Sequence, residues 1–309
     1  MLQRKAAILK DSLLQEGPLA ALKRIANHIL IHNPASPYLK AALGKELHLK
    51  LFMYLRLGYW PQIKNPRTFN EKVAHRKLYE DNELFSTVED KWQVRDYVAE
   101  KVGEDFLPEL YHVTDDPEDI PFDELPESFV VKPNHMAGPI IFVEEGDTVP
   151  REEIKAKGRE WLETTHNVMK EESWYWDIEP RILFEEYLQN EDDDVPPDYK
   201  FFVFHGEVEY VQVDLDRYSD HKRRFYDRDW NPQEFKRGYP LAPVTEKPDT
   251  FDDMVEIAET LGEDLDFIRI DLYDIDGERI AFGEMTVGPG SGVGDFEPEE
   301  IDHHFGELW

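Results

Sequence analysis

The first 58 residues follow a helical pattern of apolar positions. Leu, Ala, Leu and Leu stand at positions 2, 6, 9 and 13, and Gly17-Pro18 interrupts this pattern before a second helix expected to end near Leu30. Ser36 followed by Pro37 predicts the N-cap and first turn of a third helix. We therefore expect a helical N-terminal extension, residues 1–63, ahead of the main body.

The stretch 47–60, LHLKLFMYLRLGYW, mixes bulky apolar residues with Lys50 and Arg56. Two interpretations are open. A basic amphipathic helix can lie on a membrane surface, or it can bury its apolar face against the rest of the protein. The second is the commoner fate of such helices, and the first gives the hypothesis of a peripheral membrane contact through residues 1–60.

Helices and short strands alternate after residue 63. Thr68 and Glu71 form a capping-box pattern at the start of one helix, and His205-Gly206 is a turn signal between two strands. The periodicity predicts helices at 68–79, 90–103, about 151–170 and 251–262, and strands or hairpins at 129–133, 139–144, 181–188, 199–217 and 267–292. Antiparallel hairpins interspersed with helices indicate an α+β fold, not a doubly wound parallel sheet.

The last hairpin contains the strongest candidate chemistry. Asp276-Gly277 signals a two-residue turn, and with that turn Arg269 faces Glu284 across the strands. Asp271 then faces Phe282, and all four side chains share one face of the sheet. Asp271 and Glu284 become diagonal neighbours, near enough for both carboxylates to bind one cation.

Thr286 continues the same face, and carboxylate oxygens are ligands that suit Mg²⁺ or Mn²⁺ bridging phosphates. The alternative interpretation is a solvated acidic face in a very acidic protein. The alternating apolar residues of the hairpin favour the metal site, because they point to one buried face.

Lys132 stands at the end of the apolar strand FVV, before the loop NHMAG. Such a lysine is usually an edge residue whose ammonium reaches solvent, or it is a fixed charge aimed at an anion. The chain contains no Walker A sequence and no strand–GxGxxG–helix unit, so a phosphate site here would depend on separate lysines and a metal.

Charge is distributed unevenly along the 309 residues. Residues 1–77 carry 14 Lys and Arg against 4 Asp and Glu, whereas residues 78–309 carry 21 against 63, and the net charge is −32. An acidic coat of this size is typical of a salt-rich cytoplasm, where the Debye length is about 3 Å at 1 M salt. It argues against nucleic-acid binding by the main body.

The chain has no cysteine, which excludes disulfides, thiolate catalysis and cysteine-ligated metals. Its N-terminus contains no apolar run long enough for a signal peptide or a membrane span, so we expect a cytoplasmic protein, with peripheral contact at the inner face of the membrane as a further hypothesis. The sequence leaves the oligomeric state open.

Several segments together resemble the ATP-grasp superfamily, in particular its TupA-like, teichuronopeptide-biosynthesis branch. The resemblance covers about residues 60–302. It rests on NPRTFNEKVAHRKLY, DKWQVRDYV, FVVKPNH, PRILFEEYL, PDYKFFVFHGE, VQVDLDRYSDHKRRFYD and RIDLYDIDGERIAFGEMTVGPGSG in this order. It implies an ATP cleft between two α+β lobes, residues 64–184 and residues 185–309, after the helical extension.

The resemblance also implies roles for individual residues. Lys132 looks like the strand lysine that contacts the ATP phosphates, and Arg269 matches the arginine that steadies the charged intermediate, so both are expected to be catalytic. Thr286 stands where other members carry Asn, and only Gly138 remains of a loop that is usually richer in Gly and Ser. The implied ATP contacts are Lys91, Lys132, Gly138, Glu185, Glu186, Tyr187, Leu188 and Lys200, and the implied metal ligands are Asp271, Glu284 and Thr286.

The segment DRYSDHKRR brings four basic residues together in an acidic region: Arg217, His221, Arg223 and Arg224. They are a candidate site for an anionic substrate such as a sugar acid. Pairing with the local aspartates 214, 216 and 220 is an equal alternative.

The implied activity is that of an ATP-dependent carboxylate–amine ligase using ATP and Mg²⁺ or Mn²⁺. It would activate a carboxylate as an acylphosphate and join it to an amine, in cell-surface polysaccharide or peptide–polysaccharide synthesis. The expected substrate is a small or polysaccharide-linked acid. The alternatives are a kinase of a sugar or polymer hydroxyl and a non-catalytic nucleotide-binding partner in polysaccharide assembly.

Overall fold

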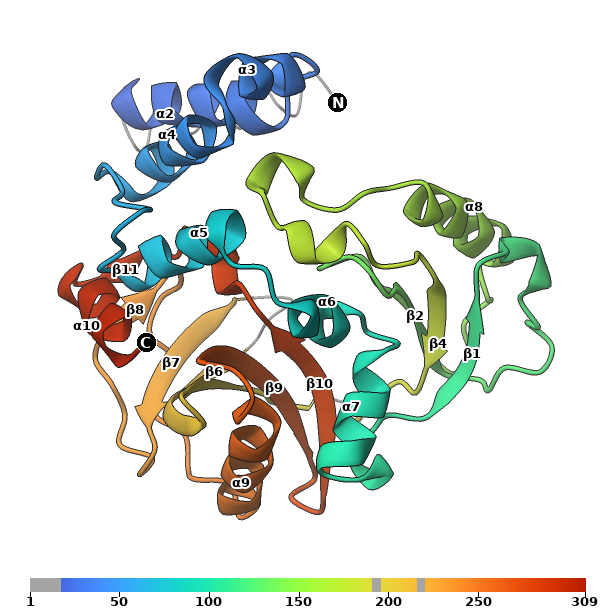
Figure 1. The fold of residues 1–309 in the computed structure, drawn as a ribbon. Helices are drawn as coiled ribbons and strands as arrows, with labels where there is room; N and C mark the ends of the chain where they lie inside the picture. Colours follow the sequence, from blue (N-terminus) through green and yellow to red (C-terminus); the bar gives the residue numbers. More distant parts are fainter. Residues whose placement is uncertain (1–17, 191–195, 216–219) are drawn as a thin grey trace.

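The computed structural model describes residues 18–190, 196–215 and 220–309, which include two larger antiparallel sheets, a two-stranded pair and a group of N-terminal helices (Figure 1). The helix predicted around positions 2–13 lies outside these residues. Within them, no helix is long and apolar enough to cross a membrane. The N-terminal helices are α2 (Pro18–Ile31), α3 (Ser36–Leu43) and α4 (Lys45–Leu57).

Helix α4 turns most of its apolar face into the protein. Leu49, Phe52 and Met53 are buried in a cluster that also contains Ala74 and Leu78 of α5 (Phe69–Tyr79). Burying a side chain of this size contributes about 1.5–3 kcal/mol. The packing interpretation of the stretch 47–60 is therefore correct for these residues, while the membrane contact stays a hypothesis.

Three predicted helix boundaries are wrong, at the start of α3, at the start of the helix predicted over 90–103 and at the end of the helix predicted over about 151–170. Ser36 is not the N-cap of α3: Ala35 takes that position, and the Ser36 hydroxyl donates to the Ile29 carbonyl at 2.8 Å, which fastens α3 to α2. The helix predicted over 90–103 begins at Val94, because the Asp90 carboxylate accepts the next backbone N–H groups and forms a turn. It follows a helix that the periodicity did not predict, α6 (Glu83–Glu89), and is labelled α7 (Val94–Lys101).

The helix predicted over about 151–170 ends early. Helix α8 runs from Arg151 to Leu162, and two short 3-10 turns follow, η3 (Val168–Lys170) and η4 (Ser173–Tyr175). Asn167 and Glu171 flank η3 with φ of 47° and 61°, a left-handed conformation that an α-helix excludes. The apolar residues of this segment continue the helical spacing, but the helical conformation of the backbone ends at Leu162.

The first sheet has the strand order β1 (Leu110–Thr114), β4 (Ile182–Glu185), β2 (Phe129–Pro133) and β3 (Ile141–Val143), with every neighbouring pair antiparallel. Helix α8 packs on it through Ile154 and Trp161. Lys132 lies near the end of β2, and Glu185 ends β4 beside it.

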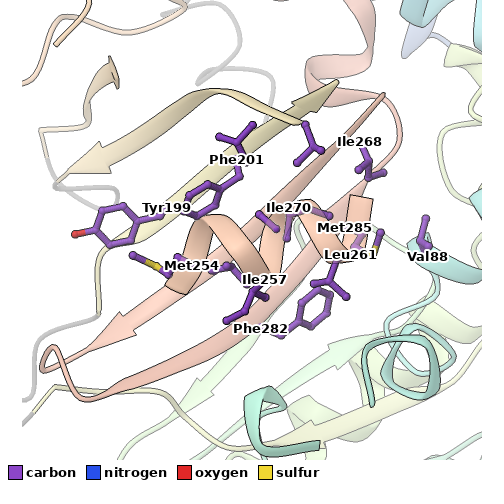
Figure 2. Packing of buried hydrophobic residues seen from close by; sticks show 14 of the residues in the cluster. Val88, Tyr199, Phe201, Met254, Ile257, Leu261, Ile268, Ile270, Phe282 and Met285 are labelled. Carbon is purple, nitrogen blue, oxygen red and sulfur yellow. The ribbon is translucent and has the colours of Figure 1, made fainter. Parts of the chain in front are cut away.

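The second sheet has the antiparallel order β10 (Arg279–Thr286), β9 (Phe267–Ile275), β5 (Asp198–Phe204), β6 (Glu207–Leu215) and β7 (Lys222–Asp227). One of its faces packs on α9 (Phe251–Gly262), with Leu261 and Ile257 against Phe201 and Ile270 (Figure 2). The other face divides into an apolar end and a polar end.

The apolar end of that face lies under α5 and α10 (Glu300–Leu308), where Phe69, Phe202, Phe267 and Phe305 form an aromatic cluster. The Phe69 and Phe267 rings meet edge to face at 5.0 Å. The short pair β8 (Lys236–Arg237) and β11 (Phe296–Glu297) and the turn η5 (Pro289–Gly292) complete this side.

Helices α6 and α7 also pack on the second sheet: Phe85, Val88 and Val98 join the cluster beneath β9 and β10. The predicted lobe boundaries, 64–184 and 185–309, assign α6 and α7 to the first lobe, whereas these helices pack on the sheet of the second lobe. They stay a prediction.

The predicted register of the last hairpin is wrong, although its turn is at Asp276-Gly277 as expected. Ile275 pairs with Arg279, which places Glu278 as one additional residue in the loop, and a second shift lies between Phe282 and Glu284. Phe282 consequently pairs with Leu272 and does not share a face with Asp271. The same shift sets Glu284 directly opposite Asp271, not diagonal to it.

The second shift depends on a glycine. A Cβ at Gly283 would stand 3.0 Å from the Asp271 carbonyl oxygen and 2.9 Å from the Tyr273 ring. An irregularity with an unpaired small residue returns the following side chain to the same face of the strand. Gly283 therefore aims Glu284 at Asp271.

Candidate active site

A cleft of about 280 Å³ lies between the two sheets. Its apolar walls include Val130, Ile140, Phe142 and Phe282, which suit a flat heterocyclic ring. Its lining also contains most of the residues that the resemblance implied: Lys91, Lys132, Gly138, Glu185, Glu186, Tyr187, Leu188, Lys200, Asp271 and Glu284.

Two lysines line the cleft, Lys132 from β2 and Lys91 from the connection between α6 and α7. Lys132 Nζ lies 2.5 Å from Glu185 Oε2, and Arg95 approaches the other oxygen of Glu185 at 3.6 Å. Lys91 donates to the Met136 carbonyl at 2.9 Å, and burial lowers the pKa of its ammonium. The strand-end lysine thus lines the cleft as a fixed charge, and does not simply extend from an edge into solvent.

Glu186 has a different environment from Glu185. Its carboxylate accepts two hydrogen bonds from Arg279, at 2.5 and 2.8 Å, and one from the Glu109 backbone N–H at 3.0 Å. The bond from Arg279 is the main reason that the pKa of Glu186 is lowered. Glu186, one of the implied ATP contacts after β4, is therefore held by Arg279 of the second sheet and by the backbone just before β1.

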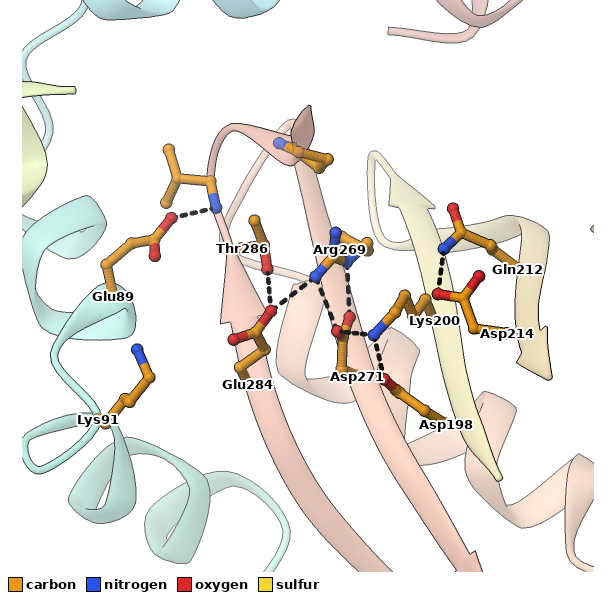
Figure 3. A network of polar contacts seen from close by, with 12 residues as sticks. Glu89, Lys91, Asp198, Lys200, Gln212, Asp214, Arg269, Asp271, Glu284 and Thr286 are labelled. Atoms are coloured by element: carbon orange, nitrogen blue, oxygen red, sulfur yellow. Dashed lines mark hydrogen bonds and ion pairs between the residues drawn. The ribbon is translucent and has the colours of Figure 1, made fainter. Parts of the chain in front are cut away.

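The carboxylates of the second sheet form a dense polar network (Figure 3). Arg269 donates to Asp271 at 2.6 and 2.7 Å and to Glu284 at 2.7 Å. Lys200 donates to Asp271 at 2.6 Å and also pairs with Asp198 on its own strand. These contacts join three strands, because Lys200 of β5 pairs directly with Asp271 of β9.

The two facing carboxylates differ in acidity. Burial raises the pKa of Asp271 to about 6, against the opposing charges of Arg269 and Lys200. Burial also acts on Glu284, but Arg269 and Lys91 outweigh it and lower the pKa of Glu284 to about 2. Burial lowers the pKa of Lys200, and the charges of Asp198 and Asp271 more than reverse this effect.

The donor set fits a divalent cation that is shared with a phosphate-bearing ligand. Among the described residues, no group of three or more His, Asp or Glu side chains stands ready to hold a metal alone. Asp271 and Glu284 supply carboxylate oxygens from paired positions, and Mg²⁺ in phosphate-transfer sites commonly takes only one or two protein carboxylates. The Thr286 hydroxyl donates to Glu284 at 3.1 Å, so its role as a direct ligand stays a prediction.

Asp198 and Arg95 belong to this site and were not predicted. Asp198 lines the cleft, and a signal for it exists, because positions 198 and 200 share one face of a strand. Arg95 reaches Glu185 from α7, and its distance in sequence from β4 gives no local signal.

Of the four basic residues proposed for an anionic substrate, the three described ones do not form one cluster. Arg217 lies outside the described residues. Arg223 donates to Asp214 at 2.6 and 3.1 Å, and His221 lies 3.2 Å from the same carboxylate. Arg224 is on the other side of β7 and donates to the Ala242 carbonyl at 2.7 Å. The structure shows the alternative for Arg223 and His221, which is pairing with a local aspartate.

Solved structures similar to this chain include a D-alanine–D-alanine ligase and an ATP-grasp ligase. D-alanine–D-alanine ligase from Bacillus anthracis complexed with ATP is 15% identical over 67% of this chain and 56% of the ligase, with a TM-score of 0.41. A second structure of that ligase is 17% identical over 73% and 66%, with a TM-score of 0.44. The ATP-grasp ligase PsnB complexed with minimal precursor is 14% identical over 81% and 64%, with a TM-score of 0.38.

This chain therefore spans between about half and two thirds of the length of these ligases. No curated protein matches the chain. The family model described as TupA-like ATPgrasp matches residues 71–309, so the helices α2, α3 and α4 precede the matched region. This match confirms the expected α+β ATP-grasp fold with a helical N-terminal segment, and the chain belongs to the TupA-like ATP-grasp family.

Proposed function

We propose that this protein is an ATP-dependent ligase that activates a carboxylate as an acylphosphate and joins it to an amine. One observation carries the proposal: Lys91 and Lys132 line the same cleft as Asp271 and Glu284. Lysines suit the phosphates of a nucleotide, and paired carboxylates suit the cation that accompanies them. Membership of the family supports the same chemistry.

The residues divide the work by position. The apolar wall with Val130 and Phe142 would receive the adenine, and Lys132 and Lys91 would hold the phosphates. Asp271 and Glu284 would hold Mg²⁺ or Mn²⁺, which when bound neutralises phosphate charge. Arg269, bonded to both carboxylates, would stabilise the charge that develops on the acylphosphate.

The reaction balances without a protein nucleophile. A carboxylate oxygen of the substrate attacks the γ-phosphorus of ATP, the bond to the bridging oxygen breaks, and ADP leaves. The amine then attacks the acyl carbon, phosphate leaves, and the amine proton passes to solvent. The protein contributes positioning and fixed charge.

The substrate class we propose is an acid destined for a cell-surface polymer, such as a uronic acid, with an amino acid as the amine. The TupA-like family supports this choice. The basic N-terminal region ahead of an acidic body supports the location that we propose with it. Location at the inner face of a membrane belongs to the same proposal.

Hydroxylamine trapping tests the acylphosphate directly. The protein would be incubated with Mg-ATP, hydroxylamine and a panel of uronic acids and amino acids, and hydroxamate and ADP would be measured together. We expect stoichiometric hydroxamate and ADP with at least one acid, lost in Asp271→Asn. A phosphorylated hydroxyl product with ADP but without hydroxamate would identify a kinase instead.

A further inference from the structure

The 134–138 loop, which follows β2 and reaches Gly138 at the cleft, is held on the side away from the cleft by the last turn of α8 and the residues that follow it. His135 is buried, and its Nε2 lies 3.1 Å from the Trp161 carbonyl oxygen and 3.0 Å from that of Thr164. The first half of the loop therefore cannot shift without breaking contacts to residues 161–164.

A second histidine holds the other half of the loop. The Ala137 backbone N–H donates to His166 Nε2 at 3.3 Å, and the Asn167 amide donates to the same nitrogen at 2.8 Å. Because two donors converge on Nε2, that nitrogen is an acceptor and the ring is neutral with its proton on Nδ1. Burial, the main cause, lowers the pKa of His166 to about 4, which agrees with a neutral ring.

The ring of His166 is itself fixed. It meets the Tyr175 ring edge to face at 4.9 Å. Asn167 continues the contact to Glu172, and Glu172 lies 3.7 Å from the ammonium of Lys77 on α5. His166 is thus a rigid acceptor beside a backbone N–H of the loop.

The segment 161–176, which we call the strut, reaches the N-terminal helices at its other end. Lys40 of α3 pairs with Glu171 at 2.5 Å and donates to the Val168 carbonyl at 2.7 Å. Met169 packs on the apolar cluster of α2 and α4. The helices before the family-matched region, which begins at residue 71, thereby contact the strut that holds the loop.

We propose that His166 is a positioning residue that fixes the 134–138 loop for the ATP phosphates, on a strut held by the N-terminal helices. The inference rests on the proposed function, because it assigns the loop to ATP. Lys91 holds the loop from the cleft side through the Met136 carbonyl, and His166 holds the next residue from behind. Loss of the acceptor would free the loop without touching the adenine wall.

The test compares two substitutions of one residue. His166→Phe keeps a ring against Tyr175 but has no acceptor, and His166→Gln keeps an acceptor near the position of Nε2. Binding of Mg-ATP and of adenosine is measured by calorimetry in molar KCl. A hydrogen bond contributes about 0.5–1.5 kcal/mol, so we expect His166→Phe to bind Mg-ATP roughly 3- to 10-fold more weakly. Adenosine affinity is unchanged, and His166→Gln restores ATP binding.

Equal ATP affinity in wild type and His166→Phe overturns the inference. So does an equal loss of ATP and adenosine affinity with a lowered melting temperature, which would show a merely structural role. His166→Leu, also without an acceptor, replaces His166→Phe if the latter does not fold. Failure of the wild type itself to bind Mg-ATP removes the proposed function and this inference together.

Hydrogen exchange separates the contact from the nucleotide. Without any ligand, the peptide containing Ala137 should exchange faster in His166→Phe than in wild type or in His166→Gln. Unchanged exchange would show that the bond does not hold the loop, whatever the ATP affinity.

Discussion

Asp271 and Glu284 lie directly opposite each other on β9 and β10, and Arg269 donates to both carboxylates. The irregular pairing at Gly283 produces this arrangement. Phe282 pairs with Leu272, and because Gly283 is passed over, Glu284 pairs with the next residue of β9, Asp271. The geometry of the proposed metal site thus depends on a residue that does not contact the ligand through a side chain.

Gly283→Ala should weaken Mg-dependent ATP binding. Its Cβ would press on the Asp271 carbonyl at 3.0 Å, so the strand must move and Glu284 with it. We expect a loss of roughly tenfold in affinity, or about 1.4 kcal/mol, by calorimetry. Gly277→Ala is the matched control: its φ of 70° makes it costly to stability, but it has open space and lies at the far turn. Equal ATP affinities in the two variants would refute this account of Gly283.

Glu89 gives the protein a pH-dependent stability. Burial raises its pKa to about 7, while the Tyr175 hydroxyl donates to it at 2.5 Å and the Val287 N–H at 2.7 Å. The folded state therefore binds more protons than the unfolded state between about pH 4.5 and 7, and this contribution to stability is present below pH 4.5 and lost as the pH rises through 7.

Glu89→Gln removes that dependence. The amide can accept from Val287 and donate to the Tyr175 hydroxyl, so both contacts survive. Urea unfolding should show the wild type losing about 3 kcal/mol relative to the variant between pH 4.5 and 7. A constant difference between the two proteins across this range would count against the assignment.

Lys40 should stabilise the junction between the N-terminal helices and the strut. Its partner Glu171 is buried, so Lys40→Met leaves a carboxylate with its main counter-charge removed. We expect a loss of about 2–4 kcal/mol in unfolding free energy, most of it recovered by adding Glu171→Gln. Additive effects of the two substitutions in a double-mutant cycle would show that the pair is not coupled.

The hypothesis of a peripheral membrane contact has a specific test. Leu22, Ile25 and Ile29 lie on one side of α2 and are 62%, 37% and 46% exposed. Wild-type protein should sediment with vesicles of anionic phospholipid in molar KCl, and replacing all three by Ser should abolish this. Val244→Ser, at a residue 59% exposed on the acidic body, is the control. Wild-type protein that stays in solution would end the hypothesis.

Some local signals in the sequence predicted local structure correctly, although three helix boundaries were wrong. The capping box at Thr68 and Glu71 is present, and the turn at His205-Gly206 joins β5 and β6 as expected. Both depend on contacts within a few residues. The order of motifs likewise identified the family, because several spaced segments had to agree at once.

Features that depend on distant contacts were missed. The register of the last hairpin could not be read from Asp276-Gly277, because the shift at Gly283 arises where β10 meets the backbone of β9. The partners of Arg223 could not be chosen either, since strand pairing decides that Asp214 lies opposite it. For the same reason Arg95 could not be connected with Glu185.

The most direct test of the account is Mg-dependent ATP binding by calorimetry in molar KCl, which screens the net charge of −32. Lys132→Met is compared with Lys155→Met, because both lysine side chains are 19% exposed and ion-paired, but Lys155 lies on α8 outside the cleft lining. We predict Mg-dependent binding by the wild type, unchanged in Lys155→Met and at least about tenfold weaker in Lys132→Met. A folded wild type that does not bind Mg-ATP, or a Lys132→Met variant that binds it equally well, would contradict the account.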